Sequence, residues 1–572
     1  MKLTPLAAYV VLWGLSMPIE LHRGALTARG PLELAMAMIG LAAALRPKNR
    51  RLYAVAFSLR FARFLTRFPL TWDTEIVQAL TDLAVATHLI AEDENGLGTS
   101  VRRQLGTFYF FAGFWKFNSS FLSPRTSCAA IYAAQIIDAY SPVASPSLAA
   151  AAIRVAPAMT VTAEVCIGTL MLLSAYSSGT TRYGALGLLL AIPLHIGIDI
   201  TPDPNNIGAF SHKAGLRYFW FVPNGATSAV NEVLAKPIIG AVYAAIGAAA
   251  LSMTIAAQQP LLWAKLQTTP LETVRGMNLW GVDWHVASHC ALCALLVRAL
   301  WLGEKPRDSK RGATPNTKLA PAQRLLVHFN ASLCLFWCCF GPVFGYRRMQ
   351  EFPNLRTQGG TNHYLRIPTS LLQQWRYKGH GVDEDPFGGG IVRVEHTTSK
   401  YINARYPADI SPLITTGAIE SLRSSNHSTK EFNTCRAILV GTFTIPTVPV
   451  DAPFVRFTVP AFELRRLLRD VRALGEPFEL TYTSLPGSGG DEQWRIHAKG
   501  RTLKLVVGKE EACTVLAAGG GAATCQLDDV ALAPFPTRDF VKRPFEAALG
   551  FVQLPSPLAI VDEDDTEVHC YV

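Results

Sequence analysis

The chain has few charged residues for its length. Of its 572 residues, only 17% are Asp, Glu, Lys or Arg, whereas 49% are hydrophobic and the mean hydropathy is +0.21. Because average soluble domains carry about 25% charged residues, the composition is too apolar for an ordinary soluble domain. It predicts a membrane protein.

Other absences narrow the function further. The sequence contains no zinc finger, basic helix or RNA-binding motif, so we expect no nucleic-acid partner, and basic loops beside an anionic membrane leaflet account for the net charge of +10. No stretch after about residue 350 is long enough to cross a bilayer. We therefore expect two domains, a transmembrane domain at 1–345 and an extramembrane domain at 346–572.

Apolar segments fill the first domain and predict an α-helical integral membrane bundle. Several are shorter than the ~20 residues that a spanning helix needs, so we expect about 7–10 true spans. The first segment has no clear small-residue cleavage site before Pro18 and is interpreted as a retained membrane helix. The segments lie near 4–20, 31–45, 52–70, 76–91, 104–121, 129–141, 149–176, 183–201, 207–222, 237–257, 283–302 and 325–345.

The domain at 346–572 has a different pattern. Short runs rich in β-branched and aromatic residues, such as Phe454–Val459 and Phe478–Tyr482, are separated by loops of glycine and proline. A hairpin is predicted at Trp494–Val507, and the apolar periodicity of Pro460–Leu474 predicts one helix. A mainly β extramembrane domain fits this pattern.

Two basic loops predict the orientation. The clusters at Arg46–Arg51 and Lys305–Arg324 should be cytoplasmic, and one further crossing at 325–345 then makes the C-terminal domain lumenal or extracellular. The sequon at Asn426 agrees with that side. Cysteines in this domain would be able to form disulfides there, in a pairing left open. The endoplasmic reticulum, the plasma membrane and an organelle are all candidate membranes.

Lys116 stands out because it lies within the apolar run Phe108–Phe117. A cation at membrane depth is costly and marks a functional site by default. A second interpretation stays open, since Asn118 and two serines follow and the segment could end there, with the amine reaching up to the headgroups.

Three motifs resemble the vitamin K-dependent γ-carboxylase family and its bacterial and algal transmembrane relatives. Tyr109–Asn118 is similar to the family helix that carries the catalytic lysine, and the match places Lys116 at that position. Downstream, Pro193-Leu194-His195 precedes Ile207-Gly208-Ala209-Phe210-Ser211, as a histidine precedes an Ile-Gly-x-Phe-Ser string in the family. Phe352–Tyr364 is a weaker likeness. The resemblance covers residues from about 5 to 370.

The resemblance implies the site residues. Lys116 and His195 would be catalytic, and Trp115, Gly208, Phe210 and Ser211 would bind substrate. Animal members carry a supporting histidine before the lysine helix, where this chain reads Trp72-Asp73-Thr74-Glu75. Either Glu75 takes that catalytic role or the substrate differs. No metal site is implied.

The resemblance also implies a chemistry. A neutral lysine in a dry site deprotonates a reduced vitamin K-like quinol, which enters from the membrane lipid. Reaction with O2 then gives an epoxide by way of a base strong enough to abstract a proton from a second substrate, with CO2 as a candidate co-substrate for carboxylation. The second substrate is unknown, and a protein is one candidate.

His195 and a second group of histidines also support other interpretations. His195 is a candidate core residue with Asp199, one turn later, as its partner. His285, His289 and Cys293 share a helix face and are candidate metal ligands, as in a membrane di-iron hydroxylase, although the other histidines are scattered singly.

A non-enzymatic transporter or receptor is the third class. Asp138, Glu164 and Asp199 lie in apolar segments and could line an ion path. Many transporters show internal repeats, and we find none in the sequence.

Overall fold

A computed structural model describes most of the chain before residue 345 and shorter segments after it. The described residues are 3–21, 31–67, 73–90, 94–124, 127–141, 145–176, 181–202, 208–222, 226–268, 281–302, 320–340, 355, 363–365, 391–399, 415–426, 456–460, 478–485, 501–507, 512–517, 522–526, 559–561 and 567–569.

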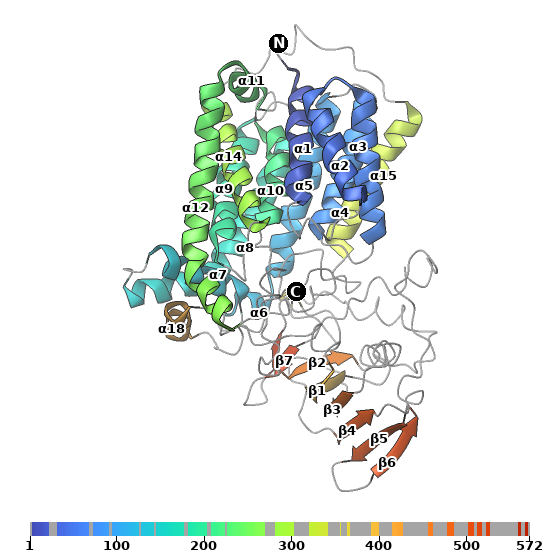
Figure 1. The fold of residues 1–572 in the computed structure, drawn as a ribbon, viewed down its shortest axis with the longest axis vertical. Helices are drawn as coiled ribbons and strands as arrows, with labels where there is room; N and C mark the ends of the chain where they lie inside the picture. Colours follow the sequence, from blue (N-terminus) through green and yellow to red (C-terminus); the bar gives the residue numbers. More distant parts are fainter. Residues whose placement is uncertain are drawn as a thin grey trace. The chain divides into compact units, whose positions relative to one another are not determined.

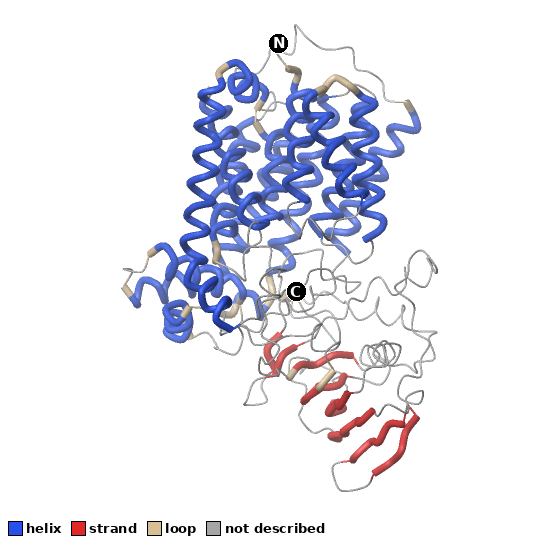
Figure 2. The backbone as a smooth tube through the Cα atoms, viewed as in Figure 1, coloured by secondary structure: helices blue, strands red, loops and turns tan. Residues whose placement is uncertain are grey.

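Each of the apolar segments predicted from the sequence contains a helix (Figures 1 and 2). The helices are α1 (Pro5–Leu21), α2 (Pro31–Leu45), α3 (Arg50–Arg67), α4 (Asp73–Ile90), α5 (Glu94–Lys116), α6 (Ser119–Leu122), α7 (Cys128–Tyr140), α8 (Pro146–Tyr176), α9 (Thr181–Ile200), α10 (Gly208–Tyr218), a 3₁₀ turn (Phe219–Phe221), α11 (Thr227–Ala235), α12 (Pro237–Thr268), α14 (Gly281–Trp301) and α15 (Pro321–Phe340).

Within the described residues, four helices are long and apolar enough to cross a membrane. They are Pro146–Tyr176, Arg182–Ile200, Pro237–Ala257 and Trp284–Trp301. The apolar helices Pro5–Ile19 and Pro31–Leu45 are shorter than the usual spanning length. The helical bundle is therefore as expected from the sequence, while the larger number of 7–10 spans stays a prediction.

The chain divides into two compact units. The first unit holds most of the helices, and the second holds all the described strands. The first unit comprises Met1–Phe114, Gln135–Pro142 and Met159–Cys339, and the second comprises Trp115–Ala134, Val143–Ala158 and Phe340–Val572.

Helices in the first unit approach closely where side chains are small. α14 packs against α12, α10 and α9 (Figure 1). A Cβ atom on Gly168 of α8 would lie 2.3 Å from the backbone nitrogen of Phe110 on α5, and one on Gly106 of α5 would lie 2.9 Å from the nitrogen of Leu172. Only glycine permits this backbone contact, as is common between membrane helices. It fixes the part of α5 that carries Tyr109.

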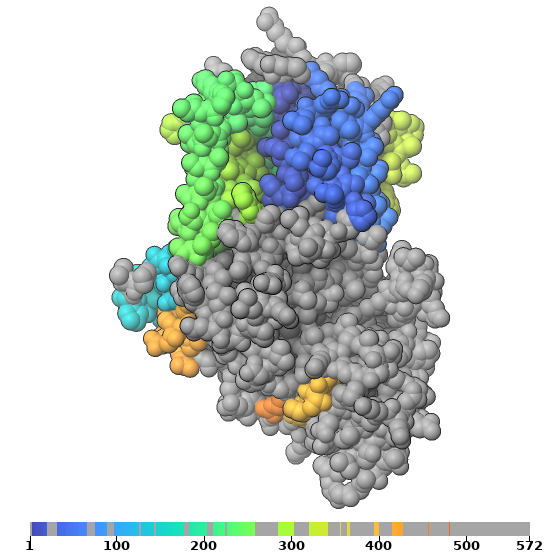
Figure 3. Space-filling view, viewed as in Figure 1, coloured from blue at the N-terminus to red at the C-terminus, as the bar shows by residue number. Residues whose placement is uncertain are grey.

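α12 presents apolar side chains outward. Ile238, Val242, Ile246 and Met253 are exposed, and Figure 3 shows α12 (green) as an uncovered column on this face of the first unit. On its other side α12 packs closely against protein, because Gly247 lets it approach the backbone of α14. An exposed apolar column of this kind suits contact with lipid rather than with water.

Fixed charges are buried in the same bundle. Asp82 of α4 accepts hydrogen bonds from Trp13 (2.9 Å) and Gln78 (2.7 Å) and pairs with Arg60 of α3 at 3.3 Å. Arg217 of α10 donates to Gln78 at 3.0 Å. We name these five residues the Asp82 cluster. Arg60, on a helix with several arginines, thus faces the interior of the bundle.

The described strands lie after residue 390 and form one antiparallel sheet in the order β6-β5-β4-β3-β1-β2-β7-β8. In register, Cys513 of β5 lies opposite Cys525 of β6. The strands are β1 (Ile391–Thr397), β2 (Phe457–Pro460), β3 (Phe478–Leu485), β4 (Arg501–Val507), β5 (Ala512–Ala517), β6 (Ala522–Gln526), β7 (Ala559–Val561) and β8 (Glu567–His569).

These strands are short, and most of 346–572 lies outside the described residues, so a mainly β domain is not established. The predicted helix at Pro460–Leu474 falls outside the described part except for Pro460, which ends β2, and the first half of the hairpin at Trp494–Val507 also falls outside it. One described helix, α18 (Thr416–Ser424), was not predicted. Thr415 caps it by accepting from the nitrogen of Ala418 at 3.4 Å.

Candidate functional site

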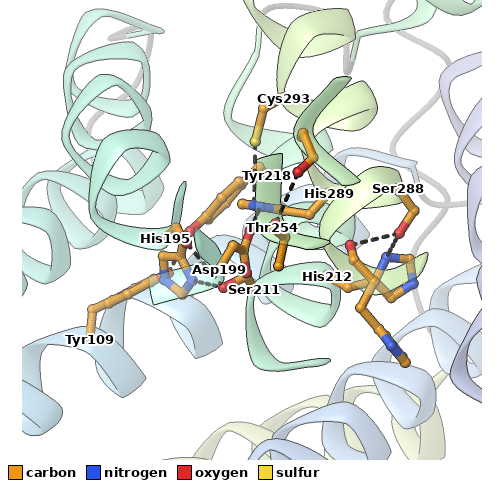
Figure 4. Close-up of polar contacts among 12 residues, drawn as sticks. Tyr109, His195, Asp199, Ser211, His212, Tyr218, Thr254, Ser288, His289 and Cys293 are labelled. Atoms are coloured by element: carbon orange, nitrogen blue, oxygen red, sulfur yellow. Dashed lines mark hydrogen bonds and ion pairs between the residues drawn. The ribbon is translucent and has the colours of Figure 1, made fainter. Parts of the chain in front are cut away.

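Four helices of the first unit bring a set of buried polar side chains together (Figure 4). At one end, the hydroxyls of Tyr109 on α5 and Tyr218 on α10 are 2.5 Å apart. Tyr109 also hydrogen-bonds Nε2 of His195 on α9, whose Nδ1 lies 3.0 Å from Oγ of Ser211 on α10. The four side chains are almost completely buried. His195 is therefore held at both ring nitrogens.

The other end of the set continues through a carboxylate. Asp199, one turn after His195, contacts Ser211, and its Oδ2 lies 2.5 Å from Nδ1 of His289 on α14. Nε2 of His289 lies 3.3 Å from Sγ of Cys293. Asp199, expected from the sequence as a partner of His195, thus pairs instead with His289. We call these seven side chains the His195 network.

One assignment of protons fits the hydrogen bonds that run from Tyr218 to Asp199. Tyr218 donates to Tyr109, and Tyr109 donates to His195. The protonated Nδ1 of His195 then donates to Ser211, and Ser211 donates to Asp199. Such a connected chain of donors and acceptors can pass a proton from side chain to side chain, which isolated buried groups cannot do. The arrangement is suited to acid–base chemistry.

Aromatic rings surround His195. The ring centroid of Phe210 lies 4.9 Å from that of His195 and 5.7 Å from that of Phe108, and Tyr218 lies 6.0 Å from His195. Phe210 and Phe108 are themselves buried. The rings keep the polar network in a dry environment, where hydrogen bonds are electrostatically stronger than in water.

The metal interpretation required His285 and His289 to act together. The ring of His285 instead meets that of His212 edge-to-face, with ring centroids 5.5 Å apart, and Oγ of Ser288 lies 2.7 Å from Nδ1 of His212. Across the described part of the chain, no three His, Cys, Asp or Glu side chains are grouped so as to hold a metal ion. The donor geometry therefore gives the di-iron alternative no support.

Lys116 lies in the second unit, at the end of α5. Only 5% of its surface is exposed, and its Nζ lies 5.8 Å from the ring centroid of Phe121. Beside it, the ring of Trp115 lies 5.5 Å from that of His363, and Asn118 forms a β-bridge with His363. Lys116 is therefore enclosed by protein, which is the opposite of what a lysine reaching out to the headgroups would show.

The predicted site residues thus fall into separate groups. The structure brings His195, Phe210 and Ser211 together in the first unit, and Gly208 begins the helix that carries the last two. Trp115 and Lys116 belong to the second unit. Glu75 lies half-buried in the first turn of α4, and the hydrogen bonds of the His195 network run through other residues.

Sequence reasoning missed the two tyrosines and the role of His289. Tyr109 was read only as part of a motif, and its partner Tyr218 lies 109 residues further along the chain. His289 is 90 residues from Asp199. The signal that was available was the cost of burying Asp199 in an apolar helix, which demands a partner from another helix.

Comparison with known families finds one match. A domain of unknown function, DUF8388, matches residues 361–542, which is about a third of the chain. The matched segment includes α18 and strands β1 to β6 and begins after the helical bundle. No curated protein and no solved structure matches the chain.

Proposed function

We propose that this protein is an integral membrane enzyme that couples oxygenation of a reduced quinone to proton abstraction from a second substrate, as the γ-carboxylase family does. One observation carries the proposal. His195 and Ser211, which come from two motifs of the resemblance, make a 3.0 Å hydrogen bond inside a buried network built for proton transfer. The enclosure of Lys116 is a second, independent support.

The residues present suit a quinol. Its flat apolar ring needs aromatic or aliphatic neighbours, and its hydroxyl groups need acceptors. Phe108, Phe210 and Tyr109 supply rings near His195, and His195 supplies a ring nitrogen whose partner is a hydroxyl. With O2, a bound quinol would supply the strong base that the second substrate requires.

The protein's own groups then have distinct roles. The resemblance gives Nζ of Lys116 the role of base toward a quinol hydroxyl, and its enclosure by protein keeps that atom away from bulk water. The His195 network holds and moves protons between Tyr109, His195 and Ser211. The aromatic rings around it exclude water that would otherwise quench a strong base.

Replacing Lys116 tests this proposal. Arginine keeps the charge but cannot give up its proton in a protein. We expect Lys116→Arg and Lys116→Ala both to lower quinol consumption by on the order of 10²–10⁴-fold, the usual contribution of a positioned base. The assay uses full-length protein in detergent with reduced naphthoquinone and O2, and follows the quinol and the epoxide by chromatography.

Lys236→Arg is the matched control, because Lys236 is 64% exposed and lies at the end of α11. It should leave turnover unchanged. Near-normal turnover in Lys116→Arg would exclude the base role and reduce the resemblance to one of fold. If wild-type protein forms no epoxide from any of several quinols, the oxygenation chemistry itself is wrong.

We further propose that the protein crosses the membrane about 7–10 times, with 346–572 as a mainly β domain on the lumenal or extracellular side. The basic loops at 46–51 and 305–324 support this orientation. The DUF8388 match supports treating the later region as a separate domain. Glycosylation at Asn426 in a eukaryotic host would place the domain on that side. If the domain instead reacted with a membrane-impermeant label only after the membrane was permeabilised, the topology would be the reverse.

A further inference from the structure

Three members of the His195 network form a smaller arrangement of their own. Sγ of Cys293 lies 3.3 Å from Nε2 of His289, and Nδ1 of His289 lies 2.5 Å from Oδ2 of Asp199 (Figure 4). Cys293 follows His289 by four residues on α14, so the two side chains share one helix face. Asp199 comes from α9, and it approaches the imidazole from the side away from the thiol.

The neutral tautomer of His289 that is protonated at Nδ1 fits both contacts. An ionised Asp199 carboxylate only accepts, so Nδ1 of His289 carries the proton and donates to it. Nε2 then presents its lone pair to the thiol of Cys293. A nucleophile that contacts a base, which is itself oriented by a third group, is the arrangement that activates thiols and hydroxyls for attack on carbonyl carbon.

Local packing holds the arrangement in place. A Cβ atom on Gly215 of α10 would lie 2.8 Å from Cδ2 of His289, so only glycine lets α10 pack against this ring. Cys293 is 3% exposed. Cys334 of α15 is buried equally well, but its Sγ has the backbone oxygen of Gln104 as a neighbour, at 4.0 Å. Burial alone therefore does not produce the contact that Cys293 makes.

Cys290 makes a redox pair conceivable, since it lies three residues before Cys293. Side chains at that spacing in a helix have Cβ atoms about 5–6 Å apart. A disulfide needs a distance of about 3.5–4.5 Å between the two Cβ atoms. α14 is helical from Gly281 to Trp301, so the bond would require local unwinding. The geometry favours chemistry at a single thiol.

We propose that Cys293 is a nucleophilic thiol that takes an acyl group from a lipid-soluble thioester. The thiol proton passes to Nε2 of His289 as the sulfur forms a bond to the carbonyl carbon. The bond from that carbon to the departing sulfur then breaks, and the departing thiolate takes the proton from His289. One thioester replaces another, so the exchange needs no oxidant, reductant or energy source. The argument for this activity does not rest on the proposed quinol chemistry, although the three residues belong to the same network.

The position of the thiol selects the acyl donor. Cys293 lies within Trp284–Trp301, one of the four helices able to cross a membrane. A water-soluble donor would have to leave water to reach it, whereas a long acyl chain gains roughly 0.8 kcal/mol for each CH₂ group that it buries. The substrate class is therefore a long-chain acyl thioester.

The test uses full-length protein in lipid nanodiscs with an alkyne-bearing palmitoyl-coenzyme A. We expect a hydroxylamine-sensitive label that mass spectrometry maps to Cys293. His289→Gln should slow labelling by on the order of 10²-fold or more, because the base is lost. Cys334→Ser should label at the wild-type rate. Acetyl-coenzyme A should label at least about tenfold more slowly than the long-chain thioester.

A second measurement needs no variant. In wild-type protein, N-ethylmaleimide should alkylate Cys293 at least about tenfold faster than the equally buried Cys334, since the thiolate is the reactive form. Equal alkylation rates would overturn the proposal, as would an acyl label absent from Cys293 or unchanged by His289→Gln. Equal labelling by acetyl-coenzyme A would overturn the substrate class. A disulfide between Cys290 and Cys293 in the purified protein would show that these two cysteines act as a redox pair instead.

Discussion

The first unit contains two buried polar groups of residues with opposite chemistry. The Asp82 cluster pairs Asp82 with Arg60 directly and with Arg217 through the uncharged amide of Gln78, and its two arginines keep their charge because arginine does not deprotonate in a protein. The His195 network consists of side chains that can each gain or lose a proton or share one. Both groups are buried, and both link helices that are distant in sequence.

The difference separates structure from function. A cluster of fixed charges can only hold helices together, and its worth is measured in stability. A network of histidine, tyrosine, serine, carboxylate and thiol is a costly way to join helices, since each group must be satisfied in a dry environment. Such a network is what the proposed proton transfer requires. Helix α10 carries members of both, with Ser211 and Tyr218 in one and Arg217 in the other.

The largest expected effect is on turnover, from His195→Gln. Glutamine can still bond Tyr109 and Ser211, but it cannot carry a proton at neutral pH. We expect quinol consumption to fall by on the order of 10²–10⁴-fold, while the unfolding temperature changes little. Turnover and thermal unfolding of the same detergent-purified samples provide the measurement.

His328→Gln is the control, because His328 lies on α15 outside the His195 network. It should leave both quantities unchanged. If His195→Gln lowered the unfolding temperature while turnover per folded molecule stayed normal, the network would be structural, and the contrast with the Asp82 cluster would disappear.

The next effect is on stability, from Asp82→Asn. The substitution leaves the buried guanidinium of Arg60 without its carboxylate, and breaking a buried ion pair in this way typically costs about 3–5 kcal/mol. We expect a lower free energy of unfolding in denaturant titrations. Turnover per folded molecule should be normal, because the proposed reaction uses no group of this cluster.

A double variant sharpens this result. Adding Arg60→Met removes the uncompensated charge and should recover a large part of the lost stability, because replacing both partners of a buried pair costs less than replacing one. Failure of the second substitution to recover any stability would mean that Asp82 acts through Trp13 and Gln78 rather than through Arg60.

Much of the helical fold was predictable from the sequence. Apolar runs located most of the helices before residue 345, because a long apolar run in a chain with so few charges usually forms a buried or membrane helix. The ends were less predictable. α5 begins at Glu94, ten residues before the predicted 104, because its first turns are polar, and it ends at Lys116, where Asn118 begins the next turn as the cap of α6.

The site was predictable only where motifs marked it. His195 and Ser211 were found because two short strings carry them. The pairing of Asp199 with His289 was not found, since sequence spacing on one helix pointed to His195 instead. Contacts between helices depend on which faces meet, and close approaches such as Gly215 against His289 decide that. A single sequence does not show directly which helix faces contact one another.

The smallest expected effect concerns an ion pair at the surface, which shows what burial adds. Arg298 of α14 donates to both oxygens of Glu232 on α11, at 3.1 and 3.2 Å, and this hydrogen bonding lowers the pKa of Glu232 below its ordinary value. A lowered folded-state pKa contributes stability above the ordinary glutamate value of about 4.3, and the contribution is lost as the pH falls toward the folded-state pKa.

Wild type should therefore unfold at a slightly higher temperature than Glu232→Gln at pH 7, and the difference should shrink as the pH falls below about 4.3. Added salt should also reduce it, because Arg298 is 38% exposed and solvent screens the pair. Arg298→Gln removes the same pair and should show the same dependence. A difference that persists unchanged at pH 3.5 would show that Glu232 acts by packing. A salt-insensitive Asp82→Asn beside a salt-sensitive Glu232→Gln would confirm that burial, rather than charge, distinguishes the two pairs.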